Sequence, residues 1–221
     1  MSGKLEYAWQ GPKRGVARVA DRAVLLAHGA GADMTAPTLT TVTDALSAAG
    51  IPSLRFRYPY RSAGKKAPDR PAVLLDATRR AVAELARRTK LPTERLVLGG
   101  RSMGGRYCSL VAGDADDPVS CLGLVLLGYP LHAAGKPEKE RSDHFPRLDM
   151  PVLFVSGTRD SLAAKPALTK AARKVKGPRS FHWIESGDHG FKPLKASGLT
   201  VDGVLAVVAA AVVGWVRDLP G

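Results

Sequence analysis

Leu96-Val-Leu-Gly-Gly-Arg-Ser-Met-Gly-Gly105 joins a short apolar run to a serine that has glycines on both sides. Read as G-x-S-x-G, the segment predicts a buried strand that turns sharply into a helix, with Ser102 at the tip of the turn. The turn requires small residues two positions before and after the serine. The following helix N-terminus would direct positive partial charge at the hydroxyl. Alone, the pattern also fits a glycine-rich turn with an incidental serine.

Strand-like and helix-like segments alternate on both sides of this turn, which predicts an α/β fold. Strands are expected at Leu5–Trp9, Val16–Ala20, Ala23–Ala27, Ser53–Arg57, Arg95–Leu98, Leu122–Leu127, Val152–Val155 and Ser180–Ile184. Helices are expected at Thr38–Ala49, Val73–Arg88, Met103–Ala112, Leu162–Val175 and Val201–Val216. Right-handed crossovers between such strands give a mostly parallel, doubly wound sheet with helices on both faces. We expect one domain over residues 1–221 without a separate lid, and Tyr58–Arg70 and His132–Asp149 are the loops that could form a partial cover.

Composition narrows the classes of partner. The chain has 221 residues, 45% of them hydrophobic, and a formal net charge of +13. That charge favours an anionic partner, but the basic residues are spread out and lack interleaved aromatic residues, so nucleic acid is not the expected partner. Two cysteines, Cys108 and Cys121, provide neither a disulfide framework nor a metal-ligand spacing, and we expect no metal or cofactor.

Hydrophobic patterning bears on location. The longest apolar run, Gly203–Val216, is shorter than the ~20 residues that a membrane span requires, and we interpret it as a core helix. The segment Met1–Glu6 lacks the apolar region of a signal peptide, so the expected location is the cytoplasm.

A serine, an aspartate and a histidine follow three of the expected strands. Ser102 follows the Leu96 strand, Asp160 the Val152 strand and His189 the last strand. Carboxyl ends of parallel strands meet at one edge of the sheet, and the order Ser…Asp…His is that of α/β-hydrolases. Alone, Asp160 could be a turn or helix-capping residue and His189 a structural loop histidine. Jointly, the three predict a nucleophile, an orienting acid and a general base.

An oxyanion hole requires two backbone N–H groups directed at the developing charge. Met103, which follows the nucleophile, is expected to supply one of them. Ala30, in the glycine-rich segment after the Ala23 strand, is expected to supply the other. We expect His28 to hold this segment in place rather than to act in catalysis.

Five motifs together resemble those of the small, lidless α/β-hydrolases of the testis-expressed type, which are related to dienelactone hydrolases. They are Gly100-Arg-Ser-Met-Gly-Gly105, His28-Gly-Ala-Gly-Ala-Asp-Met34, Gly128-Tyr-Pro-Leu-His132, Gly157-Thr-Arg-Asp160 and Gly187-Asp-His-Gly-Phe191. The resemblance covers roughly residues 20–195 and includes the loop Gly64–Arg70. It implies an α/β-hydrolase fold with Ser102, Asp160 and His189 as the triad. Dienelactone hydrolases proper carry a cysteine at the elbow where this chain has Ser102, so dienelactone is not the expected substrate.

The expected activity is hydrolysis of a small carboxylic ester, or a related acyl bond, through an acyl-enzyme on Ser102. The alternative is a non-catalytic interaction protein on the same fold. Arg61, Arg101 and Arg159, with His132, are candidate substrate contacts, since the arginines could form a positive rim that attracts anionic substrates. The same charges also fit solvated loops and packing arginines.

Overall fold

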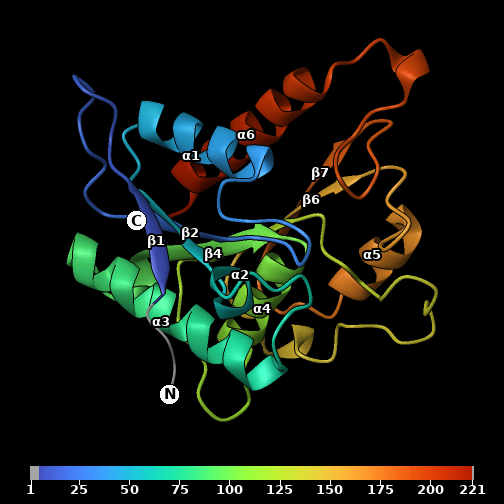
Figure 1. Ribbon diagram of the computed structural model, residues 1–221, viewed down its shortest axis with the longest axis horizontal. Helices are drawn as coiled ribbons and strands as arrows, with labels where there is room; N and C mark the ends of the chain where they lie inside the picture. The colour runs from blue at the N-terminus through green and yellow to red at the C-terminus, as the bar shows by residue number, and fades with distance from the viewer. Residues whose placement is uncertain (1–4, 221) are drawn as a thin grey trace.

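Seven strands form a single sheet in the computed structural model, which describes residues 5–220 (Figure 1). Their order across the sheet is β1-β3-β2-β4-β5-β6-β7. β1 lies at one edge and runs antiparallel to β3, whereas the other pairs are parallel. The strands are β1 (Glu6–Gln10), β2 (Ala23–Ala27), β3 (Ser53–Arg57), β4 (Leu96–Arg101), β5 (Gly123–Leu127), β6 (Val152–Gly157) and β7 (Arg179–Ile184). The predicted mostly parallel α/β sheet is confirmed.

Helices cover both faces of this sheet (Figure 1). They are α1 (Pro37–Ala48), α2 (Pro59–Ser62), α3 (Pro71–Thr89), α4 (Met103–Ala112), α5 (Lys165–Ala172) and α6 (Val201–Asp218). The buried residues of α1 and α6 pack on one face, and those of α3, α4 and α5 pack on the other. Proline occupies the first or second position of α1, α2, α3 and α5, where its missing N–H costs no hydrogen bond.

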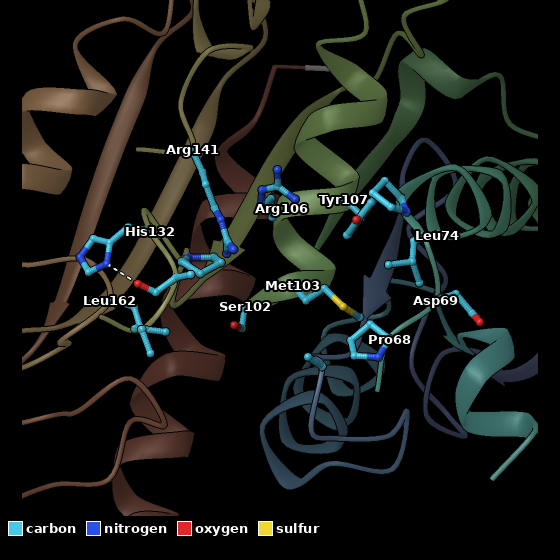
Figure 2. Close-up of a pocket in the computed structure, with 15 residues that line it drawn as sticks. Pro68, Asp69, Leu74, Ser102, Met103, Arg106, Tyr107, His132, Arg141 and Leu162 are labelled. Atoms are coloured by element: carbon cyan, nitrogen blue, oxygen red, sulfur yellow. Dashed lines mark hydrogen bonds between the residues drawn. The ribbon is translucent and has the colours of Figure 1, made fainter. Parts of the chain in front are cut away.

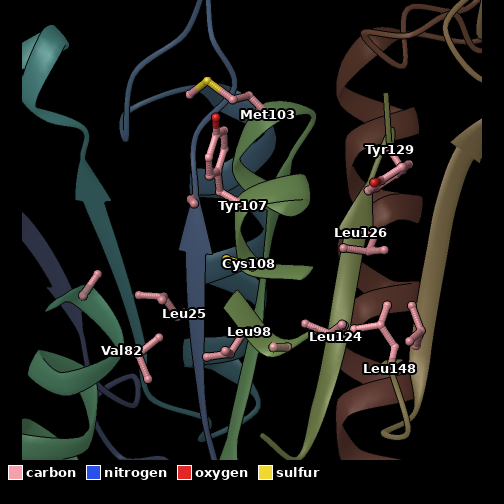
Figure 3. Packing of buried hydrophobic residues seen from close by; sticks show 14 of the residues in the cluster. Leu25, Val82, Leu98, Met103, Tyr107, Cys108, Leu124, Leu126, Tyr129 and Leu148 are labelled. Carbon is pink, nitrogen blue, oxygen red and sulfur yellow. The ribbon is translucent and has the colours of Figure 1, made fainter. Parts of the chain in front are cut away.

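The central strands are buried on both faces, which explains why they read as continuous apolar runs rather than as alternating patterns. Leu25, Leu98 and Leu124 point toward α3 and α4, where Cys108 fills the same cluster (Figure 3). Their neighbours along the strands point to the opposite face, under α1 and α6; these are Val24, Val97 and Val125. Two apolar layers therefore hold the sheet between its helices.

Strand order reverses between β2 and β4. The chain leaves β2 through α1 to form β3 on one side, then crosses back through α3 to form β4 on the other side. The segments that follow β2 and β4 diverge at this point and leave a crevice at the carboxyl edge, where open α/β sheets bind ligands. Ser102 and the segment beginning at His28 lie on its two sides.

Two local predictions differ from the structure. Val16–Ala20 is not a strand: the chain turns at Gly15, and Val19 makes a single backbone bond to the carbonyl of Gly50. Within the predicted loop Tyr58–Arg70, residues Pro59–Ser62 form the short helix α2. The Gly203–Val216 run lies in α6, and no helix within residues 5–220 has the length and apolar character to cross a membrane. Of the segment used to predict the cytoplasm, residues 1–4 lie outside the described part of the chain.

Candidate active site

Ser102 occupies a strained turn between β4 and α4. Its φ of 50° and ψ of −114° are unusual for a residue other than glycine, and its N–H donates to the carbonyl of Leu127 at 2.8 Å. A Cβ added at Gly100 or at Gly104 would lie 2.2 Å from the carbonyl oxygen of Ala27 on β2. Glycine is therefore required on both sides of Ser102 because the turn packs directly against the neighbouring strand.

A continuous hydrogen-bond chain links Ser102, His189 and Asp160. The Ser102 hydroxyl lies 2.9 Å from Nε2 of His189. Nδ1 of the same ring lies 2.9 Å and 3.0 Å from the two carboxylate oxygens of Asp160. An ionised carboxylate only accepts, so Nδ1 carries the proton and Nε2 is left to accept from Ser102. The structure thus brings together the three residues that the sequence predicts as a triad.

Asp160 is held at the end of β6. Its side chain has no exposed surface, and Oδ1 accepts the N–H of Leu162 at 2.8 Å. The neighbouring candidate Asp188 is used differently, because its Oδ1 accepts the backbone N–H groups of Gly190 and Lys192 and so shapes the loop that carries His189. The structure therefore places Asp160, rather than Asp188, against the imidazole.

Arg101 is partly buried and points toward the histidine. Its guanidinium donates to the backbone carbonyl of His189, and Nη1 lies 3.3 Å from Nε2 of that ring. The guanidinium also lies over the Phe191 ring, 5.3 Å from its centroid. Burial lowers the pKa of Arg101, and the negative charges of Asp160 and Asp188 oppose that shift. The structure thus brings this side chain against the loop that carries His189.

The segment after β2 is fixed by two side chains. His28 is fully buried; its Nε2 accepts the N–H of Tyr58 at 3.1 Å, and its Nδ1 therefore donates to the carbonyl of Gly29 at 2.8 Å. That carbonyl shares a peptide unit with the N–H of Ala30, so the bond fixes the direction of this amide. The Tyr60 hydroxyl donates to the carbonyl of Ala30 at 2.7 Å. Burial lowers the pKa of His28, which favours its neutral form.

Two cavities open beside Ser102. The larger has a volume of about 380 Å³ and extends from Ser102 and Met103 to His132 and Leu162 in one direction, and to Pro68 in the other (Figure 2). The smaller, of about 330 Å³, lies between the Gly29–Ala32 segment and His189, and Arg101 lines it. Both loops predicted as a partial cover, Tyr58–Arg70 and His132–Asp149, contribute residues to the larger cavity.

The predicted substrate contacts do not gather into one rim. His132 lines the larger cavity, and its Nδ1 lies 2.9 Å from the carbonyl oxygen of Ala133. Arg61 lines neither of the two cavities and directs Nη1 toward the carbonyl of Lys65. Arg159 is exposed and bonds the carbonyl of Ser186, also outside both cavities. Of the three predicted arginines, Arg101 lines a cavity beside Ser102, whereas Arg61 and Arg159 lie outside both cavities, and the role of these residues as substrate contacts stays a prediction.

Sequence reasoning missed the two arginines that do line the larger cavity, Arg106 and Arg141 (Figure 2). The position of Arg106 could have been predicted from the sequence, since it lies four residues after Ser102 and hence one helical turn along α4. Arg141 lies in an irregular loop, where no periodicity indicates the direction of a side chain. Within residues 5–220, no group of three or more His, Cys, Asp and Glu side chains could hold a metal ion.

Comparison with known proteins agrees with the observed fold. A family model for an alpha/beta hydrolase domain matches residues 20–217. A lidless α/β serine hydrolase from Xanthomonas campestris has a similar structure, with 24% sequence identity, coverage of 100% of this chain and 92% of that chain, and a TM-score of 0.70.

Two further solved structures are similar. Est1E from Butyrivibrio proteoclasticus, with ferulic acid bound, has 18% identity and a TM-score of 0.76, covering 97% of this chain and 95% of that chain. A dienelactone hydrolase from Anabaena variabilis has 20% identity and a TM-score of 0.73, and the match covers 99% of this chain and 94% of that chain. At these identities the structural likeness shows the fold, and the family match identifies the lineage. The chain belongs to the alpha/beta hydrolase domain family and is a hydrolase.

Proposed function

We propose that the protein is a serine hydrolase that cleaves a small carboxylic ester, or a related acyl bond, through an acyl-enzyme on Ser102. The observation that carries this proposal is the hydrogen-bond chain from the Ser102 hydroxyl through His189 to the buried Asp160. A serine hydroxyl is a weak nucleophile near neutral pH unless an adjacent base accepts its proton, and the base must be held in the correct tautomer. The contacts of His189 with Ser102 and with Asp160 support both conditions.

In the proposed mechanism, Ser102 Oγ attacks the ester carbonyl as its proton moves to Nε2 of His189. Asp160 stabilises the resulting imidazolium through Nδ1, and the amides of Met103 and Ala30 stabilise the oxyanion. The Ser102 amide is not available for this role because it donates to Leu127. His189 then protonates the departing alcohol. A water molecule, activated by the same imidazole, attacks the acyl-enzyme and releases the acid and the free serine.

A fluorophosphonate probe tests this proposal and also its alternative, a non-catalytic interaction protein on the same fold. The probe should label the wild-type protein and the Ser161→Ala variant, in which the changed serine is exposed and follows Asp160 in the sequence. The Ser102→Ala variant should not be labelled, and its rate of ester hydrolysis should fall by roughly 10⁴- to 10⁶-fold. Folded wild-type protein that neither reacts with the probe nor hydrolyses any of a panel of acyl esters would contradict the proposal.

Two finer assignments remain proposals. Within the family, we place the chain with the testis-expressed type on the five motifs described above, among them Gly157-Thr-Arg-Asp160 and Gly187-Asp-His-Gly-Phe191. The expected cytoplasmic location likewise remains a prediction.

A further inference from the structure

Two arginines share the larger cavity with Ser102. Arg106 lies on α4, where its N–H donates to the carbonyl of Ser102 at 3.0 Å, so its side chain starts one helical turn from the nucleophile. Its Nε is buried and makes no hydrogen bond. The guanidinium lies 5.6 Å from the centroid of the Tyr107 ring and beside the Tyr129 hydroxyl. These neighbours hold the cation without neutralising it.

Arg141 reaches the same place from the loop after β5. Its backbone is fixed on both sides, because its N–H donates to the carbonyl of Leu131 at 2.7 Å and its carbonyl accepts the Tyr129 hydroxyl at 2.5 Å. From this anchored position the side chain extends toward Arg106 and Ser102 (Figure 2). Burial, and next the positive charge of Arg106, lower the pKa of Arg141. The two cations are therefore close enough to repel one another.

Within residues 5–220, no carboxylate forms an ion pair with either arginine. Asp69 is the carboxylate that lines the same cavity, and it lies beyond Met103, on the far side from the two arginines (Figure 2). Partly buried like charges without a counter-charge oppose folding, and a bound anion removes that cost. Guanidinium groups suit a carboxylate because they present paired, planar donors.

We propose that Arg106 and Arg141 bind a carboxylate group of the substrate, so that the preferred ester carries a second, ionised acid a short distance from the bond that is cleaved. This inference rests on the proposed function, since it identifies the substrate class for the site at Ser102. The cavity volume of about 380 Å³ suits a small acid. The contacts do not depend on Arg61, which lies outside the cavity.

The kinetic test compares matched esters. In one arm, hemiesters of succinic, glutaric and adipic acid are paired with neutral acyl esters of equal length and the same alcohol. In the other arm, the carboxylate is part of the alcohol group of the ester, and each such ester is paired with a neutral ester of equal length. The wild-type protein should prefer the anionic member of one arm by about tenfold or more in kcat/KM, the contribution expected of a charge-assisted hydrogen bond, and added salt should reduce that preference. The rate measured with the Ser102→Ala variant gives the spontaneous hydrolysis, which is subtracted from the wild-type rate.

Variants localise the effect. Arg141→Met and Arg106→Met should each lower the ratio of anionic to neutral kcat/KM by about tenfold. Arg141→Lys keeps the charge but loses the planar fork, so it should retain part of the ratio. Arg159→Met, which removes an exposed arginine outside the cavity, should leave the ratio unchanged. A ratio near one in both arms, or a ratio that survives both methionine substitutions, overturns the proposal.

Binding provides a readout that does not require turnover. Glutarate should raise the Tm of the Ser102→Ala protein and should not raise that of the Ser102→Ala/Arg141→Met double variant, whereas neutral pentanamide should affect neither. Equal Tm shifts in the two proteins, or none, would count against the anion site. If Ser102 reacts with the probe and neutral esters are hydrolysed without any anionic preference, the proposed function stands and the anion site fails. If glutarate binds but the protein neither reacts with the probe nor hydrolyses esters, the anion site stands and the proposed function fails.

Discussion

Arg101 and His189 lie 88 positions apart in the chain, yet the guanidinium of Arg101 donates to the backbone carbonyl of His189 and also faces its Nε2 at 3.3 Å. Arginine has only N–H donors, and the well-defined acceptor for this guanidinium is the carbonyl oxygen of His189. One side chain thus positions the loop that carries the expected general base. The position is the variable residue immediately before the serine in G-x-S-x-G.

Replacing Arg101 by methionine should reduce turnover through misplacement of His189. The variant keeps an unbranched apolar stem against Phe191 but removes the donors to the His189 carbonyl. We expect kcat to fall by about 10- to 100-fold with a much smaller change in KM, because small displacements of a catalytic group have costs of this size. Arg159→Met is the matched control and should stay close to wild type. An unchanged kcat in Arg101→Met would show that the loop holds His189 without this contact.

Gly104→Ala should destabilise the protein and the elbow together. The new methyl group would lie 2.2 Å from the carbonyl oxygen of Ala27, so α4 would have to move away from β2 and carry Ser102 with it. Overpacking of this kind costs about 1–3 kcal/mol. Gly214→Ala on α6 is the control, since an added Cβ there meets nothing within 4 Å and alanine favours helices. Gly104→Ala should lower both the free energy of unfolding, measured with denaturant, and the rate of ester turnover. Gly214→Ala should lower neither.

Much of this arrangement could be predicted from the sequence because it is local. Apolar runs such as Ala23–Ala27 and Leu122–Leu127 predict buried strands, and the alternation of strands and helices predicts the parallel sheet. Because Ser102, Asp160 and His189 each follow a parallel strand, they lie at the same edge of the sheet, and this placement does not depend on how individual side chains pack. Boundaries depend on individual caps, so the helix expected at Leu162–Val175 is shorter in the structure, Lys165–Ala172.

Features set by contacts between distant segments could not be predicted in this way. The direction of Arg101 depends on where the carbonyl of His189 lies, and that of Arg141 depends on bonds from its backbone to Leu131 and Tyr129. The strand expected at Val16–Ala20 failed for a related reason. Its residues have suitable propensity, but no neighbouring strand pairs with them, and strand formation depends on such partners more than on propensity.

Tyr60→Phe should weaken catalysis through the segment that carries the Ala30 amide. The substitution removes the hydroxyl that donates to the Ala30 carbonyl but keeps the buried ring. We expect a decrease in kcat of about tenfold, with little change in KM, because the affected group acts on the transition state. Tyr58→Phe removes a different buried hydrogen bond, to Thr78, and should lower the free energy of unfolding by about 1 kcal/mol without the same loss of kcat. Equal kcat effects in the two variants would contradict this assignment.

His144 should make the protein sensitive to mild acid. It is 3% exposed, its Nε2 bonds Ser109 Oγ at 2.8 Å, and burial, followed by the charges of Arg106 and Arg147, lowers its pKa to about 4. The folded state therefore resists a proton that the unfolded chain accepts below about pH 6.5. The stability contributed by neutral His144 is complete above that pH and is lost as the pH falls toward 4, by up to about 3 kcal/mol.

His144→Gln isolates this contribution because glutamine keeps an N–H donor for Ser109 but does not titrate. Urea unfolding between pH 7.5 and 4 should show the wild type losing more free energy of unfolding than the variant, and the difference should develop mainly below about pH 6.5. Parallel curves for the wild type and His144→Gln would mean that His144 accepts a proton as readily in the folded protein as in the unfolded chain.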